Sequence, residues 1–180
     1  MPELQRADIE IGHARADEVS SLPAIERAAA RILDAHAPAE LLGESRSVEE
    51  LAEAQDKGRL YVARVDGKAV GFALLRQVEA GSLHLEEMDV APEHAQRGLG
   101  RRLLQAVCEQ AQRGGYRDVT LTTFREPAWN MPFYASAGFE ELPRERWTPA
   151  LVRLVDEETA RGLEGSRRVL MRWPCEAEGR

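Results

Sequence analysis

Residues 90–104 decide the fold, and they read VAPEHAQRGLGRRLL. Pro92 ends the strand that precedes it, because proline has no N–H to donate to a neighbouring strand. Gly98 and Gly100 then introduce a segment whose apolar residues recur at helical spacing, namely Leu99, Leu103, Val107 and Ala111. The stretch therefore predicts a strand, a glycine-containing turn and an amphipathic helix over residues 98–113.

The start of such a helix is suited to bind phosphate. Its first N–H groups lack partners within the helix and lie at the positive end of the helix dipole. Gly98 and Gly100 allow close approach of the backbone, and Arg97, Arg101 and Arg102 add positive charge. Neither GxGxxG nor GK[ST] occurs here, so Rossmann and Walker loops are excluded.

Turn residues, caps and apolar periodicity predict the other elements. Strands are expected at residues 8–14, 60–65, 68–77, 84–90, 118–123, 139–142 and 167–173. Helices are expected after Ser20 or Ser21 and at residues 48–57, 130–137 and 150–161. Ser47 and Glu50 form a capping-box pattern, and Asp66-Gly67 forms a hairpin turn. Because helices alternate with strands, we expect one α/β (α+β) domain over residues 1–180.

Composition narrows the class of partner. The formal net charge is −7, which argues against nucleic acid. The sequence has neither a membrane-spanning apolar run nor the pattern of a signal peptide. Cys108 and Cys175 are far apart, and neither a disulfide framework nor a zinc site is expected. These observations predict a cytoplasmic protein without a metal.

The glycine loop resembles motif A of the GNAT family of N-acetyltransferases, in which Val-x-Pro precedes Gln/Arg-x-x-Gly-x-Gly/Ala. Residues 95–100 read Ala-Gln-Arg-Gly-Leu-Gly, so both glycines match and Ala95 replaces Gln or Arg. The resemblance implies the GNAT fold, with a mixed central sheet of about seven strands flanked by helices. It also implies that acetyl-CoA is the acyl donor. The cofactor-binding residues implied in this loop are Gln96, Arg97, Gly98, Leu99, Gly100 and Arg101.

Residues 130–139, NMPFYASAGF, resemble motif B of the same family. The matching pattern is Phe-Tyr-x-x-x-Gly-Phe, and it implies that Tyr134 is the general acid that protonates the leaving thiolate. A phenol with a pKa of about 10 is protonated at neutral pH and can perform this task. Many family members carry an asparagine where Pro127 stands here. Asn130 is expected to contact the cofactor or to cap its helix.

The strand over residues 84–90, HLEEMDV, offers a proton acceptor for the amine. Many GNAT members carry an acidic residue three or four positions before the valine, which gives Glu87 or Glu86. Strand alternation places one of the two on the site face, and we choose Glu87. His84 is an alternative base, because its ordinary pKa is about 6.5.

The resemblance also implies that the same strand is splayed from its neighbour. The backbone of Met88, Asp89 and Val90 would then pair with the pantetheine arm, as an added strand would.

The acceptor pocket is expected near Trp129, Phe133 and the loop over residues 124–128. The opposite wall would come from the helices between Ile25 and Lys57, which carry Glu40, Glu44, Glu49, Glu50 and Glu53.

The resemblance implies acetyl transfer to a primary amine by direct attack in a ternary complex, and we expect the amine to belong to a small molecule. A protein N-terminus or lysine is an alternative acceptor, and a catalytically silent acyl-CoA-binding module is a third reading. GNAT proteins often dimerise, so the resemblance also allows a homodimer.

Overall fold

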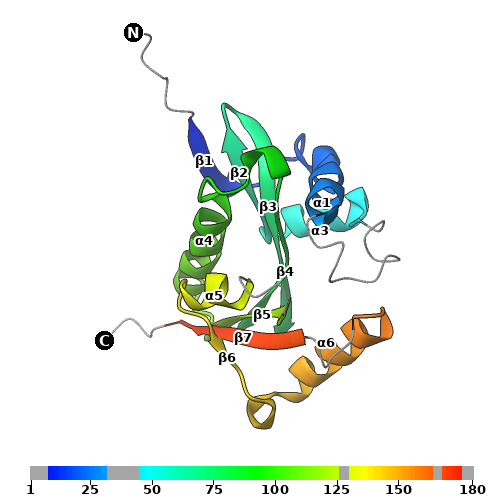
Figure 1. Cartoon of the computed structure of the whole chain (residues 1–180), viewed down its shortest axis with the longest axis vertical. Coiled ribbons are helices and arrows are strands. Elements are labelled where there is room, and N and C mark those ends of the chain that lie inside the picture. The colour runs from blue at the N-terminus through cyan, green and yellow to red at the C-terminus, as the bar shows by residue number, and fades with distance from the viewer. Residues whose placement is uncertain (1–7, 32–44, 126–129, 164–167, 176–180) are drawn as a thin grey trace.

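One mixed sheet organises the described residues, which are 8–31, 45–125, 130–163 and 168–175 of a computed structural model. Its seven strands lie in the order β1-β2-β3-β4-β5-β7-β6 (Figure 1). The strands are β1 Ile9–His13, β2 Leu60–Val65, β3 Lys68–Glu79, β4 Ser82–Val90, β5 Asp118–Phe124, β6 Glu140–Glu141 and β7 Arg168–Pro174. The predicted α/β class and the expected sheet of about seven strands are confirmed.

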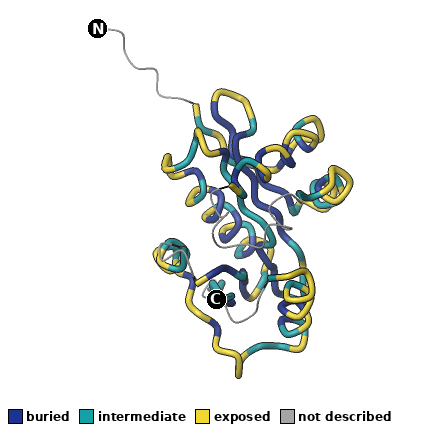
Figure 2. The backbone as a smooth tube through the Cα atoms, turned by 45° about the vertical axis from the view of Figure 1, so that its right-hand side comes forward, coloured by how far each residue is buried: buried dark blue, intermediate teal, exposed yellow. Residues whose placement is uncertain are grey.

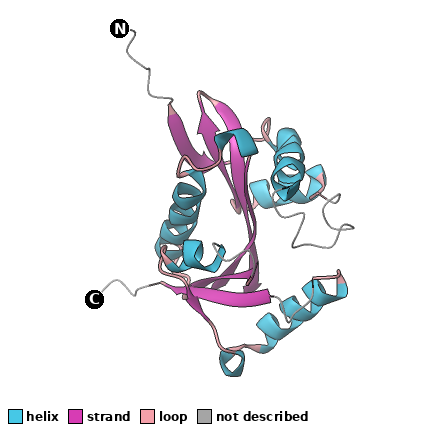
Figure 3. Cartoon of the chain, in the orientation of Figure 1, coloured by secondary structure: helices cyan, strands magenta, loops and turns pink. Residues whose placement is uncertain are grey.

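Helices cover both faces of the sheet (Figure 3). They are α1 Leu22–Ala30, α3 Val48–Asp56, α4 Leu99–Arg113, α5 Asn130–Ala135 and α6 Pro149–Ala160, with 3-10 turns at Val19–Ser21, Pro92–His94 and Arg144–Arg146. Helices α4 and α5 lie on one face, whereas α1, α3 and α6 lie on the other (Figure 1). None of the described helices is both long and apolar enough to cross a bilayer.

The core lies on both sides of the central strands, which Figure 2 shows as the buried part of the chain. On the α4 face, Leu103 and Val107 pack against β-strand residues such as Leu85. On the other face, one cluster joins α1 and α3 to β2 and β3, and another joins α6 to β7. The region between these two clusters carries the ionisable residues described below.

The central strands β4 and β5 separate halfway along β4. They run parallel and pair only between Ser82–Leu85 and Asp118–Leu121, whereas β4 continues to pair with β3 as far as Val90. Residues 86–90 therefore have no strand on their β5 side within the described chain. The predicted splay is present.

Strict alternation along β4 fails at a β-bulge. Leu75 pairs with Leu85 and Leu74 pairs with Glu87, so Glu86 is an extra residue. Arg46 lies 3.9 Å from Glu86, and its charge also acts on Glu87. Because the bulge resets the register, strict alternation does not decide between the two carboxylates, and the choice of Glu87 stays a prediction.

Local signals were read correctly at most element ends. Ser47 and Glu50 form the predicted capping box. Ser21 stands at the start of α1, but its hydroxyl donates to the Glu18 carbonyl instead of capping the helix. Helix α5 ends at Ala135, earlier than predicted. The strand predicted over residues 139–142 is shorter in the structure. There β6 is Glu140–Glu141, and Phe139 is buried in the core.

Candidate active site

The glycine loop before α4 has the backbone geometry that its sequence predicts. Gly98 occupies the N-cap position with φ of +77°, a left-handed conformation that glycine adopts without strain. Helix geometry leaves the N–H groups that follow it without intrahelical partners. A Cβ atom on Gly100 would lie 3.7 Å from the Phe133 ring and 3.9 Å from Met88 Cε. The loop therefore adjoins both α5 and β4.

The arginines of this loop differ in how they are engaged. Arg101 donates to the Ser136 hydroxyl and carbonyl, and its guanidinium lies 5.7 Å from the centre of the Phe133 ring. Arg102 donates to the Ile9 carbonyl at 3.3 Å. Gln96 and Arg97 are exposed. The backbone is thus the part of the loop best placed for an anion, and side-chain contacts from Gln96, Arg97 and Arg101 stay predictions.

Tyr134 lies in α5, between two aromatic neighbours. Its ring stands edge-on to Phe133 at 5.1 Å and to Phe139 at 6.1 Å. Burial, followed by the negative charges of Glu87 and Asp89, raises its pKa above the usual value. The hydroxyl is therefore protonated at neutral pH and lies within electrostatic reach of the β4 acids.

Asn130 anchors the other end of α5. Its side-chain amide donates to Thr123 Oγ1 at 2.6 Å and so ties α5 to β5. This contact gives Asn130 a structural role, and its predicted cofactor contact stays a prediction.

Glu87 and Asp89 form a pair of carboxyl groups on β4. Burial raises the pKa of Glu87 to about 7, with a further rise from the charge of Glu26 and an opposing effect of Arg46 and Arg168. Burial, followed by the charges of Glu87 and Glu26, raises the pKa of Asp89. A carboxylate with a pKa near neutrality is suited to general-base catalysis.

The two alternatives to Glu87 have different surroundings. Glu86 Oε1 lies 3.9 Å from Arg46 Nη2 and 3.7 Å from Arg76 Nη1. His84 is fully buried, with Nδ1 2.9 Å from Thr120 Oγ1. Burial and the nearby arginines lower the pKa of His84 to about 3, which makes it a poor base at neutral pH.

Sequence reasoning missed three charged residues of this region, which are Glu26, Arg46 and Arg168. Glu26 in α1 is only 9% exposed, and its Oε2 accepts the Arg46 N–H at 2.7 Å. Arg168 in β7 donates to Thr122 Oγ1 at 2.6 Å and to Glu158 Oε2 at 3.2 Å. A carboxylate on the apolar stripe of α1 was an available signal, because Glu26 is one helical turn from Leu22.

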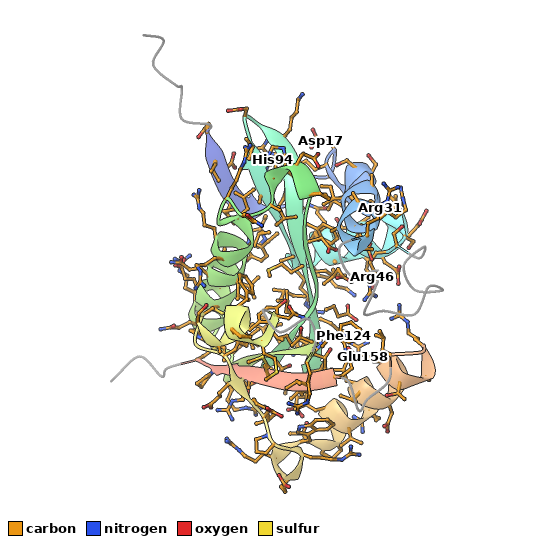
Figure 4. All side chains as sticks on the ribbon, viewed as in Figure 1. Asp17, Arg31, Arg46, His94, Phe124 and Glu158 are labelled. Atoms are coloured by element: carbon orange, nitrogen blue, oxygen red, sulfur yellow. The ribbon has the colours of Figure 1, made fainter. Side chains whose placement is uncertain are left out.

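Figure 4 places Arg46 beside α1 and α3, and it places Phe124 and Glu158 nearby on the α6 side. The predicted acceptor wall is only partly supported. Glu49 and Glu53 are exposed and Glu50 belongs to the capping box. Glu40, Glu44, Trp129 and most of the loop over residues 124–128 lie outside the described residues.

Two surface hollows are lined by other residues and include neither Glu87 nor Tyr134. One of about 340 Å³ follows the outer side of α4 past Arg101 and Ser136. The other, of about 280 Å³, lies at the far end of β4 and β5 near Ser82 and Asp118. Within the described ranges, no group of three His, Cys, Asp or Glu side chains is arranged to hold a metal ion.

Comparison with known proteins identifies the class. The sequence profile of the acetyltransferase (GNAT) family matches residues 27–139. An uncharacterised N-acetyltransferase from the hisH-hisA intergenic region of Azospirillum brasilense is 36% identical over 101 residues, which are 51% of this chain and 60% of that protein. The chain spans less than two thirds of the length of the curated relatives it matches.

Solved structures share the fold. The PaiA N-acetyltransferase of Thermoplasma acidophilum, in complex with coenzyme A, has a TM-score of 0.72 and 17% identity, covering 93% of this chain and 99% of that one. N-acetylglutamate synthase of Neisseria gonorrhoeae, complexed with coenzyme A and N-acetyl-glutamate, has a TM-score of 0.70 and 18% identity. The match covers 96% of this chain and 36% of that one.

The family match defines the class of protein, and the solved structures share its fold. The chain belongs to the acetyltransferase (GNAT) family, as its two motifs predicted.

Proposed function

We propose that this chain transfers the acetyl group of acetyl-CoA to a primary amine of a small molecule, by direct attack in a ternary complex. The observation that carries the proposal is a convergence of four features. Gly100 at the start of α4 lies near Phe133 of α5 and Met88 on the open edge of β4, and the charge of Glu87 acts on Tyr134. This arrangement supports a platform for an acyl thioester with an acid and a base beside it.

The donor would lie along α4 and β4. The free N–H groups at the start of α4 suit the pyrophosphate. The backbone of Met88, Asp89 and Val90 has no strand on its β5 side in the described chain, so the pantetheine arm can pair with it there. An N–H of the same strand can polarise the acetyl carbonyl.

The chemistry follows from the two ionisable groups. Glu87 in its ionised form accepts a proton from the ammonium group of the acceptor. The neutral nitrogen attacks the carbonyl carbon, so that a C–N bond forms and the C–S bond breaks. Tyr134 donates its proton to the departing sulfur and regains one from the nitrogen. The net reaction converts an ammonium compound and acetyl-CoA into an N-acetyl amine, free coenzyme A and one proton.

A small acceptor is favoured over a protein by the side chains around Glu87. The charges of Glu26 in α1, Arg46 before α3 and Arg168 in β7 all act on Glu87, and the three side chains are largely buried. Such an enclosed polar setting suits a small polar amine. Acetylation of a protein N-terminus or lysine is the second candidate, and a silent acyl-CoA-binding module is the third.

Release of thiol from acetyl-CoA across a panel of amines tests the proposal. We expect release with one class of amine, and a fall in kcat of about a hundredfold in Tyr134→Phe, as for loss of a general acid. The matched control is Tyr116→Phe, because Tyr116 lies beyond the far end of α4 and should leave kcat intact. Silence across the panel, with acetyl-CoA binding intact by calorimetry, would favour a protein substrate or a silent module.

A further inference from the structure

Three guanidinium groups lie on the sheet face that carries Glu87. Arg46 precedes α3, Arg76 lies in β3 and Arg168 lies in β7. Against the dominant effect of burial, the charges of Arg46 and Arg168 lower the pKa of Glu87. Burial has the largest effect on the pKa of His84, and the charges of Arg76 and Arg168 lower that pKa further. All three cations are therefore within electrostatic reach of β4, although they come from distant parts of the chain.

These guanidinium groups retain donors that their carboxylate neighbours do not use. The distances of 3.9 Å and 3.7 Å from Glu86 to Arg46 and Arg76 are longer than a hydrogen bond. Arg168 uses Nη2 for Thr122 and Glu158, but its buried Nε has no hydrogen-bond partner within the described residues. A buried donor without a partner is unfavourable, so a ligand that accepts from it is favoured.

The ligand chemistry follows from the geometry of arginine. A guanidinium offers planar, fixed donors that match the two oxygens of a carboxylate, and it stays charged at all physiological pH values. On the same face, Asp89 Oδ2 is buried and has no hydrogen-bond partner in the described chain. Unused donors and an unused acceptor thus occur together beside Glu87. They are complementary to a molecule that bears both a carboxylate and an amine.

We infer that the acceptor is an amino acid, whose carboxylate binds Arg46 and Arg168 while its amine faces Glu87. The inference rests on the proposed amine acetylation and names the substrate class of that site. In an amino acid the two groups are only a few bonds apart, which agrees with the position of Arg46, 3.9 Å from the residue that precedes Glu87. The amide bond that follows the first residue of a protein would lack this carboxylate.

The competing acceptor is a diamine. Glu26, Glu87 and Asp89 would attract a second ammonium group if all were ionised. Burial raises the pKa of each, which favours their neutral forms, whereas the arginines keep their charge. The fixed charge of the site is therefore better matched by a carboxylate.

Matched acceptors test the inference. Thiol release would be measured with each amino acid, its C-terminal amide, the amine that lacks the carboxyl group, and putrescine as the diamine. We expect kcat/KM for the acid to exceed that for its amide by about tenfold or more, as for loss of a charge-assisted hydrogen bond. Equal or better turnover of amides, simple amines or putrescine would overturn the inference and leave the proposed function standing.

Two variants assign the preference to the arginines. In Arg46→Gln, the ratio of kcat/KM for acid over amide should fall by about tenfold, because one charge-assisted contact is lost. Arg168→Gln should do the same, and Arg46→Gln remains informative if the more buried Arg168 variant does not fold. Arg113→Gln is the matched control, since Arg113 is 73% exposed on α4 and should retain the wild-type ratio.

A wild-type ratio in Arg46→Gln and a folded Arg168→Gln would overturn the assignment to these arginines. Absence of thiol release with every amine, despite intact acetyl-CoA binding, would instead overturn the proposed function, and the inference would fall with it.

Discussion

At the scale of single residues, Tyr134 and Glu87 belong to opposite faces of the sheet, and the charge of Glu87 acts on the pKa of Tyr134. Tyr134 packs with the α4 cluster, whereas Glu87 is acted on by Glu26 and Arg46 of the α1 side. Burial raises the pKa of both groups, but the effects differ. Burial keeps the Tyr134 phenol protonated and brings the pKa of the Glu87 carboxyl close to neutral pH. The two groups thus have the separated proton affinities that an acid and a base require.

The pH dependence of the reaction should report Glu87. Because its pKa is raised to about 7, the ionised base gains population as pH rises through that value. Both rates depend on the ionisation of the amine, so this dependence cancels when the wild-type rate is divided by the Glu87→Gln rate. We expect this ratio to rise with pH and to level above pH of about 7, reaching roughly a hundredfold. A ratio that is flat from about pH 5.5 to pH 8.5 would exclude Glu87 as the base.

The raised pKa of Glu87 should lower the free energy of unfolding at neutral and higher pH. The folded pKa of Glu87 lies above its usual value of 4.5, so the folded state binds more protons than the unfolded state between these values. The free energy of unfolding should therefore fall as pH rises from about 4.5 to about 7. Urea denaturation should show Glu87→Gln to be more stable than wild type at pH 8, by roughly 1–3 kcal/mol, and the difference should shrink toward pH 5. The opposite order at pH 8 would contradict the raised pKa.

At the scale of elements, α4, α5 and the second half of β4 set the donor side. Gly100 stands where the three meet, and Gly71 lets β3 and β4 approach closely. A Cβ atom on Gly71 would lie 2.7 Å from the Asp89 carbonyl oxygen, which is closer than real contacts allow. Glycines thus shape both the phosphate loop and the strand that follows the bulge.

Gly100→Trp should abolish acetyl-CoA binding, because the indole would occupy the place expected for the pyrophosphate. Gly100→Ala should retain most of it, since the added Cβ atom would make only ordinary contacts at 3.7 Å and 3.9 Å. Calorimetry with acetyl-CoA distinguishes the two variants, and circular dichroism checks that both fold. Wild-type affinity in the tryptophan variant would refute the placement of the phosphate site.

Gly71→Ala should displace β4, which pairs with the strand that carries Gly71. The clash with Asp89 and Val90 must move the strand, so we expect a loss of about 1–3 kcal/mol in stability and weaker acetyl-CoA binding. Gly12→Ala is the control, because its nearest neighbour would be Arg64 Nη1 at 3.6 Å. Equal stability of the two variants in urea would show that β3 and β4 tolerate the added atom.

Sequence reasoning succeeded where the determinants are local. The α4 helix, the capping box at Ser47 and the Asp66-Gly67 turn each depend on residues within a few positions. It failed where strands from distant parts of the chain set the register, as in the bulge at Glu86. The effect of the Arg168 charge on Glu87 likewise requires β5 and β7 to be in place. Polarity alone does not mark such residues, because charged side chains are usually exposed.

At the scale of the whole molecule, the sheet is held together by more than its apolar clusters. Arg64 in β2 is only 1% exposed and lies among polar partners of the N-terminal segment. It donates to Glu18 at 2.5 Å and 2.7 Å, to Glu10 at 3.1 Å and to the His13 carbonyl at 2.8 Å. The network fastens β1 and the turn before α1 to the sheet. A single domain over residues 1–180, a cytoplasmic location and a homodimer stay predictions.

Removing this anchor should destabilise the protein strongly. Arg64→Ala leaves Glu18 without its partner, and we expect a loss of about 3–5 kcal/mol in the free energy of unfolding. Arg15→Ala is the control: its pair with Glu10 at 3.3 Å is exposed, so the loss should stay below about 1 kcal/mol. Urea unfolding measures both variants. Similar losses in the two would show that the Arg64 network contributes little.

If acetyl-CoA binds where we propose, the separation of β4 from β5 links the survival of the protein to metabolism. Within the described chain, residues 86–90 have no strand partner on their β5 side, and at such edges chains open or aggregate. A cofactor that pairs with this edge binds only the folded state, and at a hundred times its dissociation constant it adds about 2.7 kcal/mol of stability. Starved cells with little acetyl-CoA would therefore hold a more protease-sensitive protein, whose half-life would track the carbon supply.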